Sequence, residues 1–301
     1  MKQRLDTLQV SGELLEWPAE GVAALPESID VVIPLMKRID AAVMDARPFR
    51  LIQQWGAGLE GVDLDAAKAR QIWVANVPTA GGNAESVAEH ALFLMLSLLR
   101  KLPEMEASVR RGGLGVPIGR TLAGRTVCLY GLGPIALALA QRLRPLGVRL
   151  LGLTRDPLAE KVAAFGLHGC YATSERNRCL AQTDVLVPCT PLTAETRGLI
   201  DAEALAALPP GAYLVNVGRG GLVSYDALVA ALSSRRLAGA GLDVYWQEPI
   251  SPDDPLLALP NVVATPHVAG VTEESYAQIA KAVAGNIERL RRGEPPLNRA
   301  A

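Results

Sequence analysis

The sequence predicts an α/β protein with two parallel sheets covered by helices. Short runs rich in Val, Leu and Ile alternate with longer segments rich in Ala and Leu between Ser28 and Val262, which is typical of buried strands connected by helices. The 301 residues exceed the usual size of one hydrophobic core, and 50% of them are hydrophobic. We therefore expect two packed domains with a cleft between them.

A series of short apolar segments, each bounded by turn-forming residues or by a helical segment, gives the predicted strands. They are Val31–Pro34, Leu51–Gln54, Trp73–Ala75, Thr126–Tyr130, Leu150–Leu153, Val185–Pro188, Tyr213–Asn216 and Gly239–Leu242.

Two longer segments predict helices that define the organisation of the chain. Asn83–Lys101 begins with a capping residue, carries Glu85 in its first turn and ends in two basic residues, so we interpret it as one long buried helix. Glu273–Arg292 has the spacing of an amphipathic helix, and we expect it to pack back on the first domain.

The 30 basic residues nearly balance the 31 acidic ones, so the formal net charge is -1 and no field of one sign should attract nucleic acid. Met1–Val10 lacks the apolar stretch of a secretory signal, and the best apolar run, Ala91–Leu99, is far shorter than a bilayer span. We predict a small-molecule partner, no nucleic acid and no membrane.

The cysteines show no paired CxxC spacing, and we interpret them as reduced thiols of a cytoplasmic protein. They are Cys128, Cys170, Cys179 and Cys189. No metal site is predicted.

The strand Thr126–Tyr130 is followed by a glycine turn and an Ala/Leu-rich helix, an order typical of dinucleotide-binding Rossmann domains. Gly131 permits the tight turn, and Gly133 lets the backbone approach a pyrophosphate. Ala136 fills the third small position, and the helix start offers free N–H groups to phosphate. The residues expected along the cofactor are Gly131, Gly133, Pro134 and Ile135.

The end of the next strand should decide between the two nicotinamide cofactors. The position that usually holds an acid for the ribose falls on Thr154, and Arg155 follows it, which favours NADP. NAD stays possible, because a shift of two residues would make Asp156 a ribose ligand.

The predicted fold is therefore two doubly wound parallel-sheet domains, a flavodoxin-like substrate domain and a Rossmann cofactor domain. The glycine-rich segment Arg110–Gly124 indicates where the chain crosses between them. We assign residues 1–96 and 271–301 to the substrate domain and residues 97–270 to the dinucleotide-binding domain, with a cleft that closes on ligand.

Three later segments each begin at a predicted strand end and contain Arg219, Glu248 and His267. The carboxyl ends of strands in an open α/β sheet form the ligand crevice, so these side chains can converge. Arg219 suits a carboxylate, and His267 with a neighbouring Glu248 suits general acid/base work on a carbonyl. The other histidines, His90 in the long helix and His168 in a glycine-flanked turn, are not expected to be catalytic.

From about Val31 to Gly270 the chain resembles the D-isomer-specific 2-hydroxyacid dehydrogenases. The motifs that carry the resemblance occur in order: Gly56–Asp63, Ser86–His90, the Gly131 turn, Pro191–Thr196, Asn216–Gly220, Leu242–Val244, Glu248–Pro249 and Pro266–His267.

The resemblance implies that Arg219, Glu248 and His267 are the catalytic residues. It further implies that Asp243 holds the nicotinamide carboxamide, that Thr190 and Val217 lie along the cofactor, and that the amides of Ala57 and Gly58 bind the substrate carboxylate together with Arg219. A homodimer through the cofactor domain, around the long helix, is implied as well.

Two segments depart from the family pattern. Pro134 stands where many members have an Arg close to the pyrophosphate, so phosphate binding should depend more on backbone amides. The segment Pro34–Ile39 lacks the Ser/Arg/Thr pattern of many members, so no particular substrate carries over. Lys37 and Arg38 could meet a distal phosphate, but we interpret them as a solvated pair.

The activity that the resemblance implies is reduction of a small 2-keto acid such as glyoxylate or hydroxypyruvate to the D-2-hydroxy acid. Formate oxidation stays open as an alternative that Glu248 disfavours, because that branch of the family resembles a Gln pattern. Two further alternatives stay open as well. One is a phosphoglycerate dehydrogenase-like enzyme, which is disfavoured because no regulatory domain is expected. The other is a non-catalytic NAD(H)-sensing interaction protein of the same fold, which is disfavoured by the complete set of candidate catalytic residues. The identity of the acid, the oligomeric state and the direction of the reaction are left open.

Overall fold

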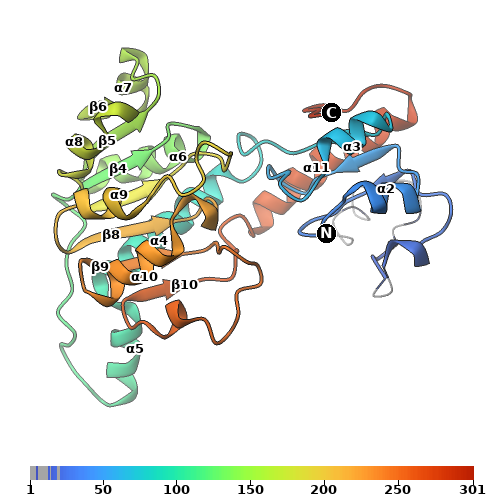
Figure 1. Cartoon of the computed structure of the whole chain (residues 1–301). Coiled ribbons are helices and arrows are strands. Elements are labelled where there is room, and N and C mark those ends of the chain that lie inside the picture. Colours follow the sequence, from blue (N-terminus) through green and yellow to red (C-terminus); the bar gives the residue numbers. More distant parts are fainter. Residues whose placement is uncertain (1–4, 6–12, 14, 19–20) are drawn as a thin grey trace. The chain divides into compact units, whose positions relative to one another are not determined.

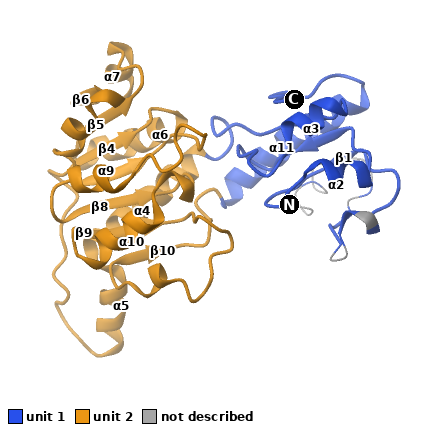
Figure 2. Cartoon of the chain, viewed as in Figure 1, with its two compact units in different colours: residues 1–83, 271–301 blue, residues 84–270 orange. Residues whose placement is uncertain are grey.

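The computed structural model describes residues 5, 13, 15–18 and 21–301. The chain divides into two compact units, residues 1–83 with 271–301 (unit 1) and residues 84–270 (unit 2) (Figure 2). Each unit has its own parallel sheet, and the two sheets with their helices confirm the α/β class.

Unit 2 is built on seven parallel strands in the order β10-β9-β8-β7-β4-β5-β6 (Figure 1). From the central strand β4, the chain first adds strands on one side and then on the other, which is the Rossmann order with one additional strand. The strands are β4 (Thr126–Tyr130), β5 (Arg149–Thr154), β6 (Gly169–Ala172), β7 (Val185–Pro188), β8 (Ala212–Asn216), β9 (Leu237–Leu242) and β10 (Val262–Ala264).

Helices cover both faces of this sheet. Those on one face include α4 (Ala84–Arg100), α6 (Pro134–Leu143) and α7 (Ala159–Phe165), and those on the other include α8 (Arg176–Leu180), α9 (Ala202–Ala207) and α10 (Tyr225–Ser233). Strand β4 alternates between the two cores, with Val127 and Leu129 in the first and Cys128 and Tyr130 in the second. This period of two is why a strand buried on both faces has a continuous apolar sequence.

Short connecting elements complete unit 2. They are α5 (Leu102–Arg110) and the 3₁₀ turns η2 (Arg144–Leu146), η3 (Thr173–Glu175), η4 (Gly220–Leu222) and η5 (Pro255–Ala258).

The first crossing between the units lies between Asn83 and Ala84, not after residue 96 as expected, and Arg110–Gly124 lies wholly in unit 2. The reason is that β9 contains glycines which let α4 approach closely. A Cβ at Gly241 would lie 3.0 Å from Leu94 Cβ, and one at Gly239 would lie 3.1 Å from Leu98 Cδ2. Helix α4 is therefore bound to the Rossmann sheet along its length.

Unit 1 contains three parallel strands in the order β1-β2-β3. Its elements are η1 (Val22–Ala24), β1 (Val31–Val32), α2 (Ala41–Ala46), β2 (Leu51–Gln53), α3 (Leu64–Ala69), β3 (Trp73–Ala75) and α11 (Glu273–Arg291). The order follows the chain and is shared by several α/β folds, so the flavodoxin-like topology stays a prediction.

The C-terminal helix returns to unit 1 as expected. Asn286 of α11 donates from Nδ2 to Gln53 Oε1 at 2.7 Å, inside the buried layer between the helix and β2. The last residues then pair with β3, because Ala300 donates its amide to Val74 O at 2.7 Å and Val74 donates to Ala301 O at 3.1 Å. An antiparallel bridge between Ala75 and Arg299 extends this pairing.

Each predicted strand is present, with ends shifted by at most two residues. Strands β6 and β10 were not predicted. Both lie at the edges of the large sheet, where β6 is half-buried throughout and begins at a glycine, and where β10 is short and ends just before Pro266. Edge strands lack the continuous apolar run that identifies the central ones.

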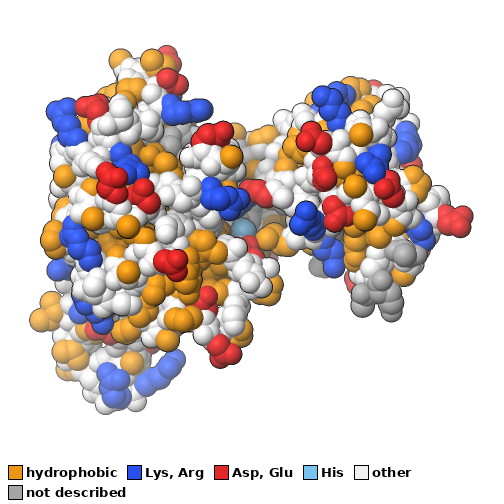
Figure 3. Space-filling view, in the orientation of Figure 1, with side chains coloured by type: hydrophobic (Ala, Val, Ile, Leu, Met, Phe, Trp, Pro, Cys, Tyr) orange, Lys and Arg blue, Asp and Glu red, His pale blue; other side chains and the backbone are white. Residues whose placement is uncertain are grey.

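Over the described part of the chain, none of the helices combines the length and apolarity that a bilayer crossing requires. Acidic and basic side chains are interspersed on the face drawn in Figure 3, in line with the near-zero net charge.

Candidate active site

The candidate residues of unit 2 gather at one edge of its sheet. Because all seven strands are parallel, the segments that follow them emerge on the same side. These segments include Gly131 after β4, Thr154 at the end of β5, Thr190 after β7, Val217 after β8, Asp243 after β9 and His267 after β10.

The glycine turn after β4 has the geometry that a dinucleotide needs. Gly131 has φ 99°, and a Cβ there would lie 2.9 Å from both the carbonyl carbon of Cys189 and the amide nitrogen of Thr190. Only glycine fits, because the loops after β4 and β7 touch at this point. At Gly133 the nearest heavy atom to an added Cβ is 4.0 Å away, so its backbone is open to a ligand.

Helix α6 begins directly after this turn, with Gly133 at its N-cap and Pro134 as its first residue. Proline has no N–H, so the first amide that the helix can offer to a phosphate is that of Ile135. Ala136 is fully buried against the sheet. The cradle therefore fits a pyrophosphate bound through backbone amides, with no Arg in the turn.

Thr154 is the last residue of β5, and Arg155 follows it in an exposed position. The pKa of Glu195 is lowered, first by the hydrogen bond from the Thr193 hydroxyl at 2.6 Å and to a smaller extent by the positive charge of Arg155. Arg155 thus lies close enough to the loop after β7 for its charge to act on Glu195. Arg155 follows β5, at the position where NAD-binding and NADP-binding proteins differ.

His267 and Glu248 form a close pair. The His267 Nδ1 atom lies 2.7 Å from Glu248 Oε2, and the other carboxylate oxygen accepts from the Tyr245 amide at 2.9 Å. An ionised carboxylate can only accept, so Nδ1 is the donor and carries a hydrogen. The second ring nitrogen, Nε2, is then the one left to exchange a proton with a substrate.

Arg219 belongs to the loop after β8. Burial raises the pKa of Glu248, but the His267 hydrogen bond, the Tyr245 amide and the charges of His267 and Arg219 outweigh it and lower that pKa overall. Asn216 Nδ2 donates to the Arg219 carbonyl at 2.9 Å, which fixes the loop backbone. A Cβ at Gly220 would overlap the Tyr245 backbone, so glycine is needed where the two loops press together.

Asp243 is fully buried and anchors the turn that carries His267. Its Oδ1 accepts from the Val268 amide at 2.9 Å, and its Oδ2 accepts from the Ala269 amide at 2.8 Å. His267 itself has φ 53°, in the left-handed region that side-chain-bearing residues seldom adopt. The implied contact of Asp243 with a nicotinamide carboxamide stays a prediction.

Sequence reasoning missed a group of contacts at Thr265. His90 Nε2 lies 2.8 Å from Thr265 Oγ1, which in turn lies 2.6 Å from Asp243 Oδ1. Tyr245 donates its hydroxyl to the Thr265 carbonyl at 2.9 Å. The sequence contained one indication of these contacts, which is the position of His90 beside the buried face of α4. His168, in contrast, lies at the amino end of β5, where its Nδ1 accepts from the Leu150 amide at 3.1 Å.

The loop of Ala57 and Gly58 lies in unit 1. Gly56 has φ 129°, and the Ala57 carbonyl accepts from Asn76 Nδ2 at 2.8 Å. Among the described residues, no group accepts a hydrogen bond from the Ala57 or Gly58 amide. An anion could therefore take both amides, as the resemblance implies. Val217, in unit 2, is buried.

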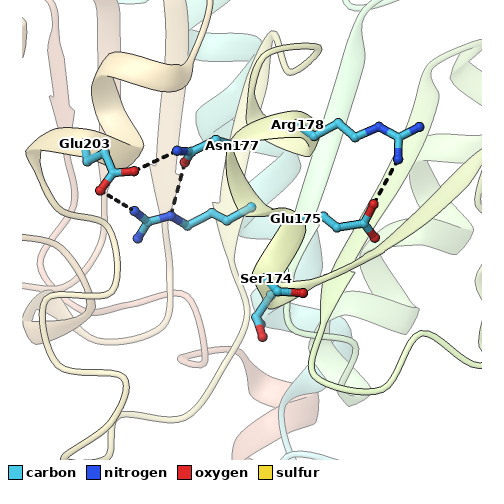
Figure 4. Close-up of a pocket in the computed structure, with 7 residues that line it drawn as sticks. Ser174, Glu175, Asn177, Arg178 and Glu203 are labelled. Atoms are coloured by element: carbon cyan, nitrogen blue, oxygen red, sulfur yellow. Dashed lines mark hydrogen bonds and ion pairs between the residues drawn. The ribbon is translucent and has the colours of Figure 1, made fainter.

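A hollow on the α8 side of unit 2 is separate from these residues (Figure 4). Its charges pair with one another: Arg178 lies 2.9 Å from Glu175, and Arg176 lies 3.4 Å from Glu203. Asn177 donates to the same Glu203 at 2.7 Å. We interpret this hollow as a self-paired surface cluster. Within the described ranges, no group of three or more His, Cys, Asp or Glu is placed to hold a metal ion.

The sheet order, the glycine turn and the imidazole–carboxylate pair together define a dinucleotide-binding protein of the Rossmann class. Residues 92–269 match the sequence pattern of the D-isomer specific 2-hydroxyacid dehydrogenase NAD-binding domain, which is more than half of the chain. The chain belongs to the D-isomer-specific 2-hydroxyacid dehydrogenase family, and the resemblance inferred from the sequence motifs is confirmed.

The chain is similar to relatives with two different names. It is 36% identical over 270 residues to the glyoxylate reductase of Korarchaeum cryptofilum, covering 86% of this chain and 79% of that protein. It is also 36% identical over 282 residues to the D-3-phosphoglycerate dehydrogenase of Archaeoglobus fulgidus, covering 93% of this chain but 52% of that protein. The chain thus spans about half the length of the curated phosphoglycerate dehydrogenases that it matches.

Among solved structures, the NADPH-dependent glyoxylate/hydroxypyruvate reductase of Sinorhizobium meliloti, in complex with NADP and malonate, is similar with a TM-score of 0.86. Its sequence is 33% identical, and the match covers 100% of this chain and 94% of that one.

Proposed function

We propose that this chain is an NAD(P)H-dependent reductase of small 2-keto acids that forms the D-2-hydroxy acid. The observation that carries the proposal is the contact of 2.7 Å between His267 Nδ1 and Glu248 Oε2, with Arg219 on the adjoining loop. A protein that only sensed a nucleotide would have no use for an oriented acid/base pair.

The three side chains take separate roles in this proposal. Glu248 holds the His267 ring through Nδ1, which leaves Nε2 to give a proton to the substrate carbonyl oxygen during reduction. Arg219 holds the substrate carboxylate and polarises the carbonyl. The family resemblance, and not the placement of the units, is the support for proposing the Ala57 and Gly58 amides as carboxylate donors. When bound, the reduced nicotinamide supplies the hydride that reaches the carbonyl carbon.

Glyoxylate and hydroxypyruvate are the proposed substrates. The names of the relatives in Korarchaeum cryptofilum and Sinorhizobium meliloti support this choice. Initial rates with glyoxylate, hydroxypyruvate, pyruvate and 3-phosphohydroxypyruvate, followed by the absorbance of the reduced cofactor, should give the highest kcat/KM for one of the first two. Absence of turnover with every acid would instead favour the non-catalytic, nucleotide-sensing alternative.

A phosphoglycerate dehydrogenase-like activity is the second candidate, because relatives of that name match most of this chain. The basic pair Lys37 and Arg38 is the only part of Pro34–Ile39 with the charge to meet a distal phosphate. Lys37 already lies over the Trp17 ring, with 5.5 Å from Nζ to the centroid. We therefore expect replacement of both residues by alanine to leave glyoxylate turnover unchanged. A selective loss of 3-phosphohydroxypyruvate turnover would favour the second candidate.

NADPH is the proposed preferred cofactor, with NADH as the alternative. The support is the exposed Arg155 directly after β5, next to Thr154 where an acid would repel a 2′-phosphate. Initial-rate assays should give a higher kcat/KM for NADPH, and a clear preference for NADH would contradict this part of the proposal.

A homodimer through unit 2 is also proposed. Figure 1 shows α5 beyond the end of α4, away from the sheet. The segment that follows α5 exposes large apolar side chains. Leu114 is 96% exposed and Ile118 is 84% exposed, which is unusual for a protein surface that no partner covers. Light scattering on Ile118→Glu should show a monomer, and Met36→Glu, an exposed position in unit 1, should stay dimeric.

The cytoplasm remains the proposed location. The four cysteines show no paired CxxC spacing, which suits reduced thiols.

A further inference from the structure

We propose that His90 and Tyr245 are positioning residues that hold Thr265 and thereby aim His267 at the substrate. The proposal rests on the proposed function, because it assigns His267 the proton transfer. It adds a role for residues that belong neither to the catalytic set nor to the cofactor turn. We call Thr265, His90, Asp243 and Tyr245 the Thr265 clamp.

The directions of the hydrogen bonds in the clamp follow from donor counting. Asp243 is an acceptor only, so the single hydroxyl hydrogen of Thr265 points to Asp243 Oδ1, at 2.6 Å. Thr265 Oγ1 must then accept from His90 Nε2, at 2.8 Å. Burial lowers the pKa of His90, although the charge of Asp243 opposes this, which favours a neutral ring with its hydrogen on Nε2. The chain of donors therefore runs from α4 through Thr265 to the buried carboxylate.

Tyr245 connects the two halves of the proposed acid/base pair. Its hydroxyl donates to the Thr265 carbonyl at 2.9 Å, and its amide donates to Glu248 Oε1 at 2.9 Å. Burial raises the pKa of Tyr245 to about 12, so the hydroxyl keeps its hydrogen and remains a donor. One residue thus touches both the turn that carries His267 and the carboxylate that orients its ring.

The turn needs such support because of its backbone. His267 has φ 53°, and its amide donates to the Thr265 carbonyl at 3.1 Å, so the same carbonyl is shared by Tyr245 and His267. A left-handed residue other than glycine persists only where its surroundings fix it. Within the clamp, Asp243 fixes the far side of the turn through the Val268 and Ala269 amides. His90 and Tyr245 fix the near side through Thr265.

The test compares variants at Thr265 that keep or remove the hydroxyl. Thr265→Val has the same shape but loses both side-chain hydrogen bonds, and we expect kcat to fall by about tenfold to a hundredfold, as for a catalytic group displaced by about 1 Å. The Kd for the cofactor should change by a smaller factor than kcat, because the phosphate cradle after β4 is untouched. Thr265→Ser keeps the hydroxyl and should restore kcat to within about threefold of wild type. Tyr245→Phe should lower kcat by a smaller factor.

Thr183→Val is the matched control. Thr183 is fully buried and donates its hydroxyl to the Cys179 carbonyl at 3.0 Å, on the α8 side of unit 2. Its loss should lower the midpoint of thermal unfolding and leave kcat unchanged, which separates a positioning effect from a general structural one. If Thr265→Val does not fold, His90→Leu and His90→Gln provide a second pair, of which only Gln keeps a donor.

The two proposals fail in distinguishable ways. An active wild type with a folded Thr265→Val of equal kcat would overturn the clamp and leave the reductase proposal standing. The same holds if Thr265→Ser is as impaired as Thr265→Val, or if His90→Gln is as impaired as His90→Leu. A wild type that turns over no 2-keto acid would overturn the proposed function, and the clamp with it.

Discussion

Two turns at the carboxyl edge of the larger sheet are built in opposite ways. The turn after β4 is made of backbone, with Gly131 pressed against the loop after β7 and helix α6 following directly in the sequence. The turn after β10 is held by side chains from elsewhere, Asp243 after β9 and His90 on α4. The comparison teaches that a phosphate cradle is built mainly from one backbone segment that fits against a neighbouring loop. The orientation of the His267 ring depends instead on side chains from several separate elements.

The largest effect on activity is expected from replacing His267, which lies in the turn after β10. His267→Ala should lower kcat by about 10² to 10⁴, the usual contribution of a general acid/base, with little change in cofactor affinity. His168→Gln is the control, because that ring accepts from the Leu150 amide at the amino end of β5 and should leave kcat within about twofold. Unchanged turnover in His267→Ala would contradict the proposal that the turn after β10 carries the acid/base group while the turn after β4 binds phosphate.

The next effect is expected at Gly131, in the turn made of backbone. Gly131→Ala would place a Cβ 2.9 Å from the Cys189 carbonyl carbon, so the loops after β4 and β7 must separate. The Kd for NADPH, measured by fluorescence titration, should rise by about tenfold or more, which corresponds to at least ~1.4 kcal/mol.

Gly147→Ala is the matched control for that substitution. Gly147 also has a left-handed backbone, with φ 70°, but an added Cβ there would have nothing within 4 Å. Gly147 precedes the amino end of β5, whereas the cofactor turn lies at the carboxyl edge of the sheet. It should cost about 1–2 kcal/mol of stability and leave NADPH affinity unchanged. If both variants lose cofactor affinity equally, backbone strain and not the close approach is the cause.

A smaller effect should sharpen the choice of cofactor. Arg155→Gln should lower kcat/KM for NADPH by about tenfold, the loss expected for one charge-assisted hydrogen bond, and leave NADH nearly unaffected. Arg149→Gln, at the first residue of the same strand, where Arg149 bonds to Gln182, is the control. An equal loss with both cofactors would assign Arg155 a structural role.

The smallest effect concerns the stability of the His267 turn. The lowered pKa of Glu248 means that folding favours its ionised form, so this contribution is fully present above the ordinary carboxyl value of 4.5 and is lost as the pH falls through the lower folded-state value. Urea unfolding should show that Glu248→Gln is more destabilised relative to wild type at about pH 7 than at about pH 4. A constant difference would mean that the pair contributes no pH-dependent stability.

The sequence predicted those parts of the molecule whose signals are local. The central strands, the glycine turn after β4 and helix α11 were predicted because apolar runs, glycine spacing and amphipathic spacing each lie within one short segment. The start of unit 2 at Ala84 was not, because it depends on glycines of β9 that receive α4.

The same limit applied to the candidate site. The positions of Glu248 and His267 after strand ends were predictable, and the two side chains lie in hydrogen-bond contact. Their catalytic roles stay a prediction. The contact of His90 with Thr265 joins residues far apart in the sequence, and a histidine in a helix gives no sign of its partner. Side-chain networks of this kind become visible only when the packing of α4 on β9 is known.

The pairing of the final residues with β3 has a consequence for aggregation. Without Arg299–Ala301 the backbone groups of Val74 would form an open sheet edge, and open edges recruit strands from other molecules. Residues 299–301 thus cover the β3 edge of the smaller sheet. Substitutions that disrupt this pairing should make unit 1 self-associate.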